Sequence, residues 1–219
     1  MSTKRVEAPH SRELRKQRRM DAPGTWFVTK SLWPRKPCLN ELGVAEVVAS
    51  ALMGLVHSNR IQLAAFVVMP DHWHALFACG GLPEPPSTNK LPNGAAPTGP
   101  RSLEHEAGSP PNQPVARADR QAPISCPDPL PAVMHSIGTW IGTRTASQLA
   151  VLGLHWEKGY YDTRIRSSRQ FRFVLNYIEN NPVAQGIVSK PREWPWSSAH
   201  PSYRGVLTRP WPWAFEKDT

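Results

Sequence analysis

The segment from Phe66 to Ala78 decides the fold of this chain, and it reads Phe-Val-Val-Met-Pro-Asp-His-Trp-His-Ala-Leu-Phe-Ala. An apolar run enters the segment, Pro70-Asp71 supplies turn chemistry, and a second apolar run leaves it, which predicts two strands joined in a tight hairpin. Alternate residues of a strand share a face, so we expect His72 and His74 to point to one side and Trp73 to the other. Two imidazoles on a stiff strand suit paired metal ligands. Because His-x-His pairs are also common as surface or hydrogen-bonded core histidines, the spacing alone does not decide between the two interpretations.

The composition indicates one ordered domain with a long proline-rich segment. The 219 residues include 24 prolines, which are placed unevenly along the chain, and that number is about twice the average share. The net charge of +9 indicates a polyanionic partner, either nucleic acid or an anionic surface. Nine tryptophans are numerous enough for some to stack on unpaired bases, although packing in the core is the commoner role of tryptophan.

Cysteine spacing and hydropathy exclude several classes of protein. The three cysteines form no CxxC pair, so neither a disulfide framework nor a thiolate zinc site is indicated; they are Cys38, Cys79 and Cys126. Cys79 is an odd number of residues from His74 and therefore belongs to the opposite face of a regular strand. No apolar stretch reaches ~18 residues and the N-terminus lacks the apolar core of a signal peptide, so we expect a cytoplasmic protein without membrane contact.

The first twenty residues are strongly basic and predict a flexible N-terminal arm over residues 1–20. Two interpretations of this arm stay open. It is either a solvated tail or a segment that lies along DNA phosphates. In the second case its DNA-binding candidates are Arg15, Lys16, Arg18 and Arg19.

The ordered domain is predicted to consist of two pieces, residues 21–80 and 132–200. In the first piece, residues 25–29 are β-branched and aromatic and predict a strand. Apolar residues at helical spacing then predict a helix over residues 42–58. The hairpin follows this helix. Residues 81–131 are rich in Pro and Gly and show no periodicity. We expect them to be a disordered insertion, since such a segment cannot bury enough apolar surface to offset its chain entropy. Residues 201–219 are treated as a C-terminal tail.

A helix near residue 170 is the second informative element. Ser167 or Ser168 suits an N-cap, and an apolar stripe runs through Phe171, Val174, Leu175 and Ile178. Pro182 is expected to end the helix. Tyr177 lies off the apolar stripe, and Asn181 follows four residues later on the same side, so a phenol and an amide can face a common point. Position alone does not select this tyrosine over Tyr160, Tyr161 and Tyr203.

Four motifs occur in a fixed order along the chain. They are Val68-Met69-Pro70-Asp71-His72-Trp73-His74, Trp156-Glu157-Lys158-Gly159-Tyr160-Tyr161-Asp162, Tyr177-Ile178-Glu179-Asn180-Asn181-Pro182-Val183 and Trp194-Pro195-Trp196-Ser197-Ser198. Together they resemble the REP-associated tyrosine transposases, which belong to the wider group of single-tyrosine HUH transposases and nucleases. The resemblance covers about residues 25–79 and 134–198.

The resemblance implies an α+β fold, with a ferredoxin-like antiparallel sheet and helices packed on it. It implies His72 and His74 as metal ligands, Asn181 as the residue that completes the metal site, and Tyr177 as the catalytic nucleophile. The implied substrate is single-stranded DNA folded into a hairpin, typified by REP-like palindromes, which is cut and rejoined through a 5′-phosphotyrosine intermediate. Mixed nitrogen and oxygen ligation suits a divalent metal, either Mn²⁺ or Mg²⁺.

Further DNA contacts are expected from cations that flank the motifs, although each could equally be a solvated surface residue; they are Arg144, Lys158, Arg164 and Arg166. Two departures from the family pattern concern the insertion and the helix after it, which contains Gly138 and Gly142 and is less basic than the resemblance implies. The principal hypothesis is a metal-dependent single-stranded DNA endonuclease and strand transferase. The alternative is a domesticated hairpin-DNA-binding protein with little or no turnover, and a metal-dependent hydrolase without a covalent step is a third. The sequence leaves the oligomeric state, monomer or dimer, open.

Overall fold

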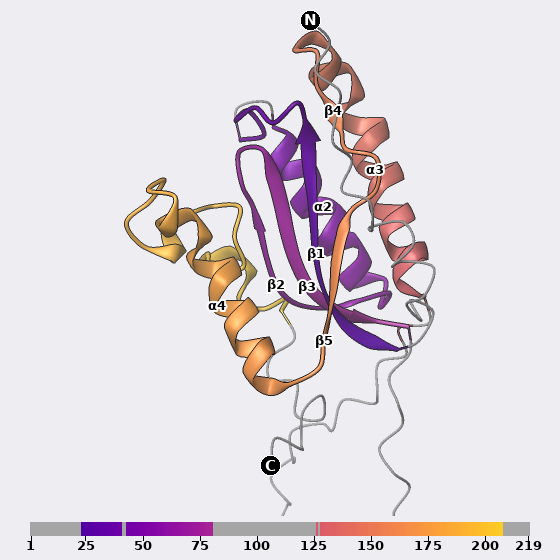
Figure 1. Ribbon diagram of the computed structural model, residues 1–219, viewed down its shortest axis with the longest axis vertical. Coiled ribbons are helices and arrows are strands. Elements are labelled where there is room, and N and C mark those ends of the chain that lie inside the picture. Colours follow the sequence, from indigo (N-terminus) through magenta and orange to yellow (C-terminus); the bar gives the residue numbers. More distant parts are fainter. Residues whose placement is uncertain (1–22, 41–42, 81–125, 127, 208–219) are drawn as a thin grey trace, which may run out of the picture. The chain divides into compact units, whose positions relative to one another are not determined.

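A computed structural model describes residues 23–40, 43–80, 126 and 128–207 of the chain (Figure 1). All of them belong to one contact unit. The predicted basic arm, nearly all of the predicted insertion and the end of the predicted tail lie outside the described residues. Among the described residues, no helix is both long and apolar enough to cross a membrane.

The described elements begin with the order β-α-β-β-α-β, which is the order expected for a ferredoxin-like fold. The elements are β1 (Gly24–Trp33), α2 (Val44–His57), β2 (Gln62–Val68), β3 (His72–Cys79), α3 (Leu130–Val151), β4 (His155–Trp156), β5 (Tyr161–Ile165) and α4 (Ser168–Ala184), followed by the short 3₁₀ helices η1 (Pro191–Glu193) and η2 (Pro201–Tyr203).

The sheet is antiparallel throughout, with strand order β2-β3-β1-β4 and with β5 also paired to β1. The predicted α+β fold with a ferredoxin-like antiparallel sheet is confirmed. Strands β3 and β1 are the inner strands, so each has a hydrogen-bonded neighbour on both sides. Because paired residues share a face, the register sets His74 beside Thr29 of β1 and Val67 of β2.

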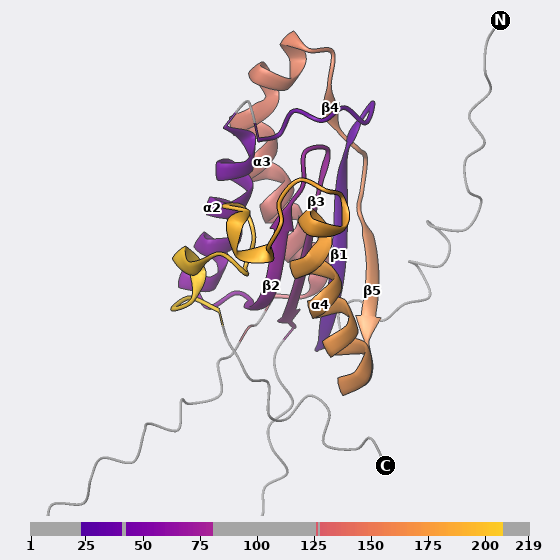
Figure 2. The same cartoon turned by 90° about the vertical axis from the view of Figure 1, so that its left-hand side faces the viewer.

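Helices cover both faces of this sheet (Figures 1 and 2). Helices α2 and α3 bury one face, where Trp26, Val28 and Trp73 contribute from the strands. Helix α4 lies on the other face, over a smaller apolar cluster that includes Leu76 and Ile178. The hairpin is therefore buried on both sides, which explains why β2 and β3 are apolar at almost every position.

The predicted hairpin is confirmed, and so is the split between its two faces. The backbone N–H of Met69 donates to the carbonyl of His72 at 2.8 Å and closes the turn. Trp73 is fully buried against the α2 and α3 layer, whereas both histidines face α4.

The segment after α4 packs on the core through Trp194, and it also extends the sheet. Ser197 forms a β-bridge with Val67, and the N–H of Val68 donates to the carbonyl of Trp196 at 2.8 Å. The indole N–H of Trp194 donates to the carbonyl of Val68 at 2.8 Å. This pairing covers part of the exposed edge of β2, which would otherwise present unpaired backbone groups.

Several predicted boundaries differ from the structure. The strand predicted over residues 25–29 is observed over Gly24–Trp33, and the helix predicted over residues 42–58 is observed over Val44–His57. Two further differences involve proline. Helix α4 does not end before Pro182 but continues to Ala184. Pro182 lies in the last turn, so its missing N–H removes a single helical hydrogen bond, and the buried side chains of Asn181 and Pro182 hold the turn in place. Helix α3 begins at Leu130, before the predicted restart at residue 132, because Pro131 occupies the first turn, where proline is well tolerated.

Candidate active site

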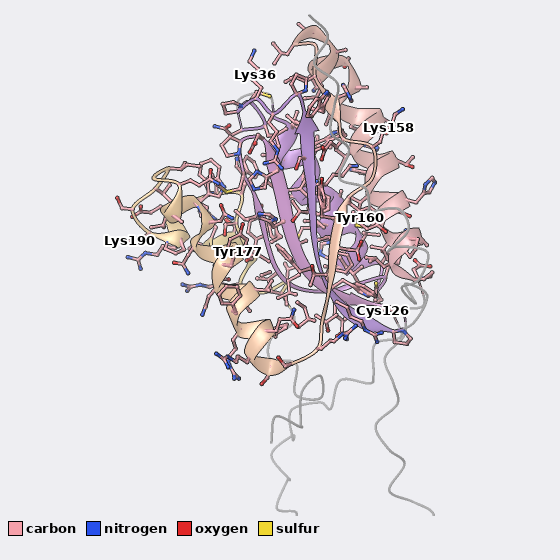
Figure 3. All side chains as sticks on the ribbon, in the orientation of Figure 1. Lys36, Cys126, Lys158, Tyr160, Tyr177 and Lys190 are labelled. Atoms are coloured by element: carbon pink, nitrogen blue, oxygen red, sulfur yellow. The ribbon has the colours of Figure 1, made fainter. Side chains whose placement is uncertain are left out.

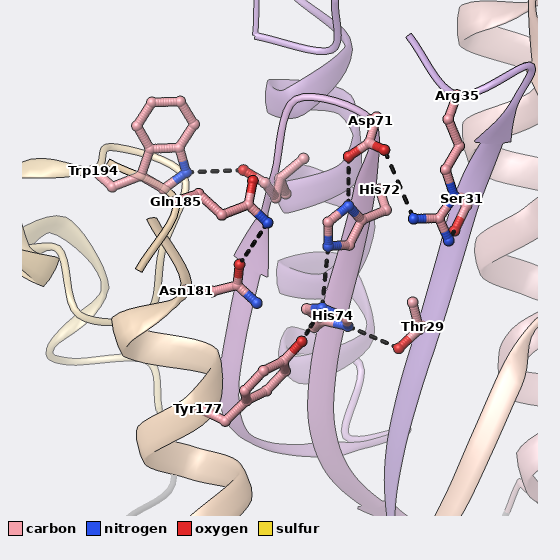
Figure 4. A network of polar contacts seen from close by, with 11 residues as sticks. Thr29, Ser31, Arg35, Asp71, His72, His74, Tyr177, Asn181, Gln185 and Trp194 are labelled. Atoms are coloured by element: carbon pink, nitrogen blue, oxygen red, sulfur yellow. Dashed lines mark hydrogen bonds and ion pairs between the residues drawn. The ribbon is translucent and has the colours of Figure 1, made fainter. Parts of the chain in front are cut away.

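The histidine pair lies on the inner strand β3, on the face covered by α4 (Figure 4). His72 and His74 are both buried. Their Nε2 atoms are 3.1 Å apart, and their ring planes meet at 71°. Strand β3 is paired on both sides, so the backbone that carries the two rings is fixed by two ladders of hydrogen bonds.

Each imidazole is oriented by a hydrogen-bond partner at its Nδ1 atom. The Nδ1–H of His72 donates to Oδ1 of Asp71 at 2.6 Å, and Nδ1 of His74 lies 2.7 Å from the hydroxyl of Thr29. A carboxylate only accepts hydrogen bonds, so Nδ1 of His72 carries a proton. Such outer partners commonly fix the tautomer and ring orientation of metal-binding histidines.

Burial keeps His74 neutral. Its pKa is lowered to about 3, first by removal of the ring from water and then by the neighbouring His72 and Arg35. The imidazole therefore retains a lone pair at neutral pH, which is the protonation state that a metal ligand requires.

Tyr177 points from α4 toward the histidines (Figures 3 and 4). Its hydroxyl oxygen lies 3.5 Å from Nε2 of His74, and its ring packs edge-on against Phe27 with centroids 6.1 Å apart. The side chain is nevertheless 46% exposed, so a substrate can approach the phenol from solvent.

The other tyrosines do not reach the histidines in this way. Tyr203 stacks edge-on with Phe66, which belongs to the core on the α2 face, and Tyr160 packs against the same core. Tyr161 is exposed on β5. The structure therefore separates Tyr177 from these residues, which the sequence alone did not.

Asn181 lies one helical turn beyond Tyr177, is buried, and lies on the side of α4 that faces the histidines (Figure 4). Its Oδ1 accepts a hydrogen bond from Nε2 of Gln185 at 3.2 Å. Gln185 was not singled out from the sequence. The sequence spacing could have indicated it, because Gln185 follows Asn181 by four residues, as Asn181 follows Tyr177, and residues at this spacing lie on one side of a helix.

The donor atoms fit a divalent cation. Two ligands at a right angle and ~2.1 Å from an ion are about 3 Å apart, and the two Nε2 atoms are separated by 3.1 Å. Among the described residues, no group of three His, Cys, Asp or Glu side chains could complete the coordination. An ion at this point would therefore need an amide oxygen, a substrate oxygen or water to complete its coordination.

Arg35 is a second residue that sequence reasoning missed. Its guanidinium donates to the hydroxyl of Ser31 at 3.2 Å and lies 3.8 Å from the carboxylate of Asp71. Arg35 thereby supports the residue that orients His72, and it places a positive charge close to the pair. It follows the end of β1, outside every recognised motif, so no sequence pattern pointed to it.

Two of the predicted DNA-binding arginines lie away from the histidines. The Arg164 side chain shares the α2 and α3 face with its register partner Trp26 and donates to the carbonyl of Pro23 at 2.7 Å. Arg144 is exposed on α3, with its guanidinium carbon 3.3 Å from the ring centroid of Trp140.

Of the remaining predicted DNA-binding residues, two are exposed at the surface and four lie outside the described part of the chain. Lys158 is exposed in the turn between β4 and β5, toward α3 in Figure 3. Arg166 is exposed between β5 and α4, at the base of the helix that carries Tyr177. The four candidates of the N-terminal arm lie outside the described residues; they are Arg15, Lys16, Arg18 and Arg19.

The chain has an antiparallel sheet with a histidine pair on an inner strand, and a tyrosine on the facing helix points toward that pair. Its α+β fold matches that of a REP-associated tyrosine transposase. A solved structure described as a REP-associated tyrosine transposase bound to a REP hairpin matches this chain with a TM-score of 0.51 and 21% sequence identity, over 90% of this chain and 93% of that one.

The sequence comparison gives the same result. The curated REP-associated tyrosine transposase of Escherichia coli (strain K12) is 22% identical over 189 residues, which are 86% of this chain and 84% of that protein. No protein-family model matches the chain. The resemblance seen in the four motifs is thus confirmed over most of the length of both chains.

Proposed function

We propose that this protein is a metal-dependent, single-stranded DNA endonuclease and strand transferase that uses Tyr177 as its nucleophile. The observation that carries the proposal is the distance of 3.5 Å between the Tyr177 hydroxyl and Nε2 of His74. A phenol is a weak nucleophile at neutral pH and must be aligned with an electrophilic phosphorus. The same side chain is partly exposed, as a nucleophile that attacks a macromolecule must be.

His72, His74 and Asn181 would hold the divalent cation. When bound, the ion would supply Lewis-acid stabilisation of the charge that develops on the scissile phosphate. The contribution of the chain is to keep both Nε2 lone pairs directed at one point, through Asp71 and Thr29, and to hold the amide of Asn181 on the facing helix.

In the proposed reaction the phenolic oxygen of Tyr177 forms a bond to the phosphorus, and the bond from phosphorus to the 3′-oxygen breaks. The phenol loses its proton and the leaving oxygen gains one, so the products are a 5′-phosphotyrosine and a free 3′-hydroxyl. The bond energy is kept in the adduct. Attack by another 3′-hydroxyl therefore rejoins a strand without a nucleotide cofactor.

The proposed substrate is DNA that folds into a hairpin with a single-stranded flank. A solved structure with the same fold is described as bound to a REP hairpin. The net charge of +9 suits a polyanionic partner.

The test is an adduct assay with labelled hairpin oligonucleotides and Mn²⁺ or Mg²⁺, analysed on a denaturing gel. We expect a covalent protein–DNA adduct that is lost in Tyr177→Phe. Tyr203→Phe is a matched control, since it removes a phenolic hydroxyl that lies against the core on the α2 face and should leave the adduct in place. Cleavage that survives Tyr177→Phe would indicate a hydrolase, and hairpin binding without any cleavage would indicate the domesticated DNA-binding protein.

A further inference from the structure

Helix α4 exposes a large aromatic ring beside the proposed nucleophile. Phe173 is 71% exposed and lies one turn before Tyr177, so the two rings are on the same side of the helix. The residues that fix α4 to the sheet are different ones, including Val174 and Ile178. Phe173 therefore does not contribute to the described core.

A second exposed ring lies on the other side of the histidines. Tyr161 of β5 is 57% exposed and pairs with Thr29, the residue that contacts His74. Residues paired across antiparallel strands share a face, so Tyr161 belongs to the sheet face that carries the histidine pair. The two exposed rings thus flank the candidate active site from α4 and from β5.

The surface around Phe173 is cationic. From residue 165 to residue 178 the chain contains three arginines and no acidic residue. Arg169, Phe173 and Tyr177 follow one another at intervals of four residues and form one row along α4. Within the part of the chain that the structure describes, the exposed side chains of Arg169 and Arg172 form no ion pair.

We propose that Phe173 and Tyr161 are stacking platforms for unpaired bases of the DNA strand next to the scissile phosphate, and that Arg169 binds a backbone phosphate of the same strand. This inference rests on the proposed function. A ring that is largely in solvent and adjoins free guanidinium groups matches the chemistry of single-strand binding, in which bases stack on aromatic side chains and cations track the backbone. In this arrangement the DNA strand would run along α4 from Arg169 past Phe173 to the phenol of Tyr177.

The test measures binding apart from cleavage. The probe is a fluorescein-labelled REP hairpin with a single-stranded flank, and its affinity is measured by anisotropy in the Tyr177→Phe background. Phe173→Ala should weaken binding by about 5- to 150-fold, the range that base stacking on one ring provides. Phe173→Trp should retain the affinity, whereas Phe173→Leu, which keeps apolar surface but no ring, should lose most of it.

An abasic scan shows whether the ring contacts a base. Each flank nucleotide is replaced in turn by an abasic sugar. At one position the replacement should weaken the binding of DNA to the Tyr177→Phe protein. The same replacement should not weaken binding further in the double variant that also carries Phe173→Ala. Trp140→Ala is the control, because Trp140 is an exposed ring on α3, which packs on the other face of the sheet. That variant should leave the abasic pattern unchanged.

Several results would overturn the inference. They are unchanged affinity in Phe173→Ala, equal loss in Trp140→Ala, tighter binding of the matching RNA than of the DNA, or a change in oligomeric state in Phe173→Ala, which would make the patch a subunit contact. Failure of the proposed function is distinguishable, since it would appear as a missing adduct in the wild-type protein while binding still depends on Phe173.

Discussion

The hydroxyl of Thr29 lies 2.7 Å from Nδ1 of His74, and this contact joins the two inner strands of the sheet at the candidate metal site. A hydroxyl can accept the Nδ1–H of the imidazole. In that tautomer Nε2 keeps its lone pair and is available to a cation. Thr29 thus has a specific role that its position in a β-branched strand did not indicate.

We expect Thr29→Val to weaken Mn²⁺ binding by about 10- to 100-fold, since loss of an outer partner has that effect at histidine metal sites. Valine has nearly the same shape but leaves Nδ1 without its partner. The measurement is calorimetric titration of Mn²⁺. Thr163→Val is the control, because Thr163 is exposed on β5 on the same face of the sheet, and equal affinities for both variants would contradict the prediction.

The lowered pKa of His74 predicts acid instability. In the unfolded chain His74 titrates near 6.5, whereas in the fold its pKa is about 3 because the ring is removed from water. Between these values the unfolded state binds the extra proton, so the free energy of unfolding falls as the pH falls below about 6.5. The slope contributed by one such group approaches ~1.4 kcal/mol per pH unit.

The check is urea unfolding in EDTA between pH 7 and pH 4, with wild type compared with His74→Asn. We expect the stability advantage of the wild type over the variant to shrink as the pH falls. A constant difference across this range would show that His74 is not held neutral by the fold.

The hairpin and the helix of Tyr177 could be predicted from the sequence because their signals are local. Turn residues between two apolar runs define a hairpin, and alternation along β3 assigns His72 and Trp73 to opposite faces. The same reasoning identified Tyr177 as lying off the apolar stripe of α4. Resemblance to a family then selected it from four tyrosines, and the distance to His74 supports that choice.

The residues around the pair could not be predicted, because their contacts join segments far apart in the chain. Arg35 reaches Asp71 across 36 positions, and nothing near Arg35 in the sequence signals this. The placement of Arg164 required the strand register, which puts it beside Trp26 and on the face opposite the histidines. Pro182 was misjudged because a local rule for proline was applied where tertiary packing holds the last turn.

The buried cysteines are expected to be unreactive in the folded protein. Burial raises the pKa of the Cys79 thiol to about 12 and that of Cys126 to about 11, and Cys38 is also buried. The thiolate is the reactive form, so alkylation by iodoacetamide at pH 8 should be slow. Mass spectrometry should show little labelling of the native protein, and labelling of all three cysteines in urea. Rapid labelling without urea would contradict the described burial.

Lys30 should stabilise the fold although it carries a charge into a buried position. Its ammonium group donates to the carbonyls of Glu157 and Gly159 at 3.0 and 2.9 Å, and so ties the turn between β4 and β5 to β1. Hydrogen bonds from charged donors are worth about 1.5–3 kcal/mol, and removal of the ammonium leaves both carbonyls without this donor. We therefore expect Lys30→Met to lower the free energy of unfolding by about 1.5–3 kcal/mol.

The matched control for this variant is Lys158→Met, which changes an exposed lysine within the same turn. Exposed substitutions of this kind usually change stability by less than about 0.5 kcal/mol. Chemical denaturation monitored by tryptophan fluorescence measures both variants. Because Lys30 points to the α2 and α3 face with its register partner Trp73, its loss should act on the support of β5 rather than on the histidines. Equal stability of the two variants would show that the turn is held by its other contacts.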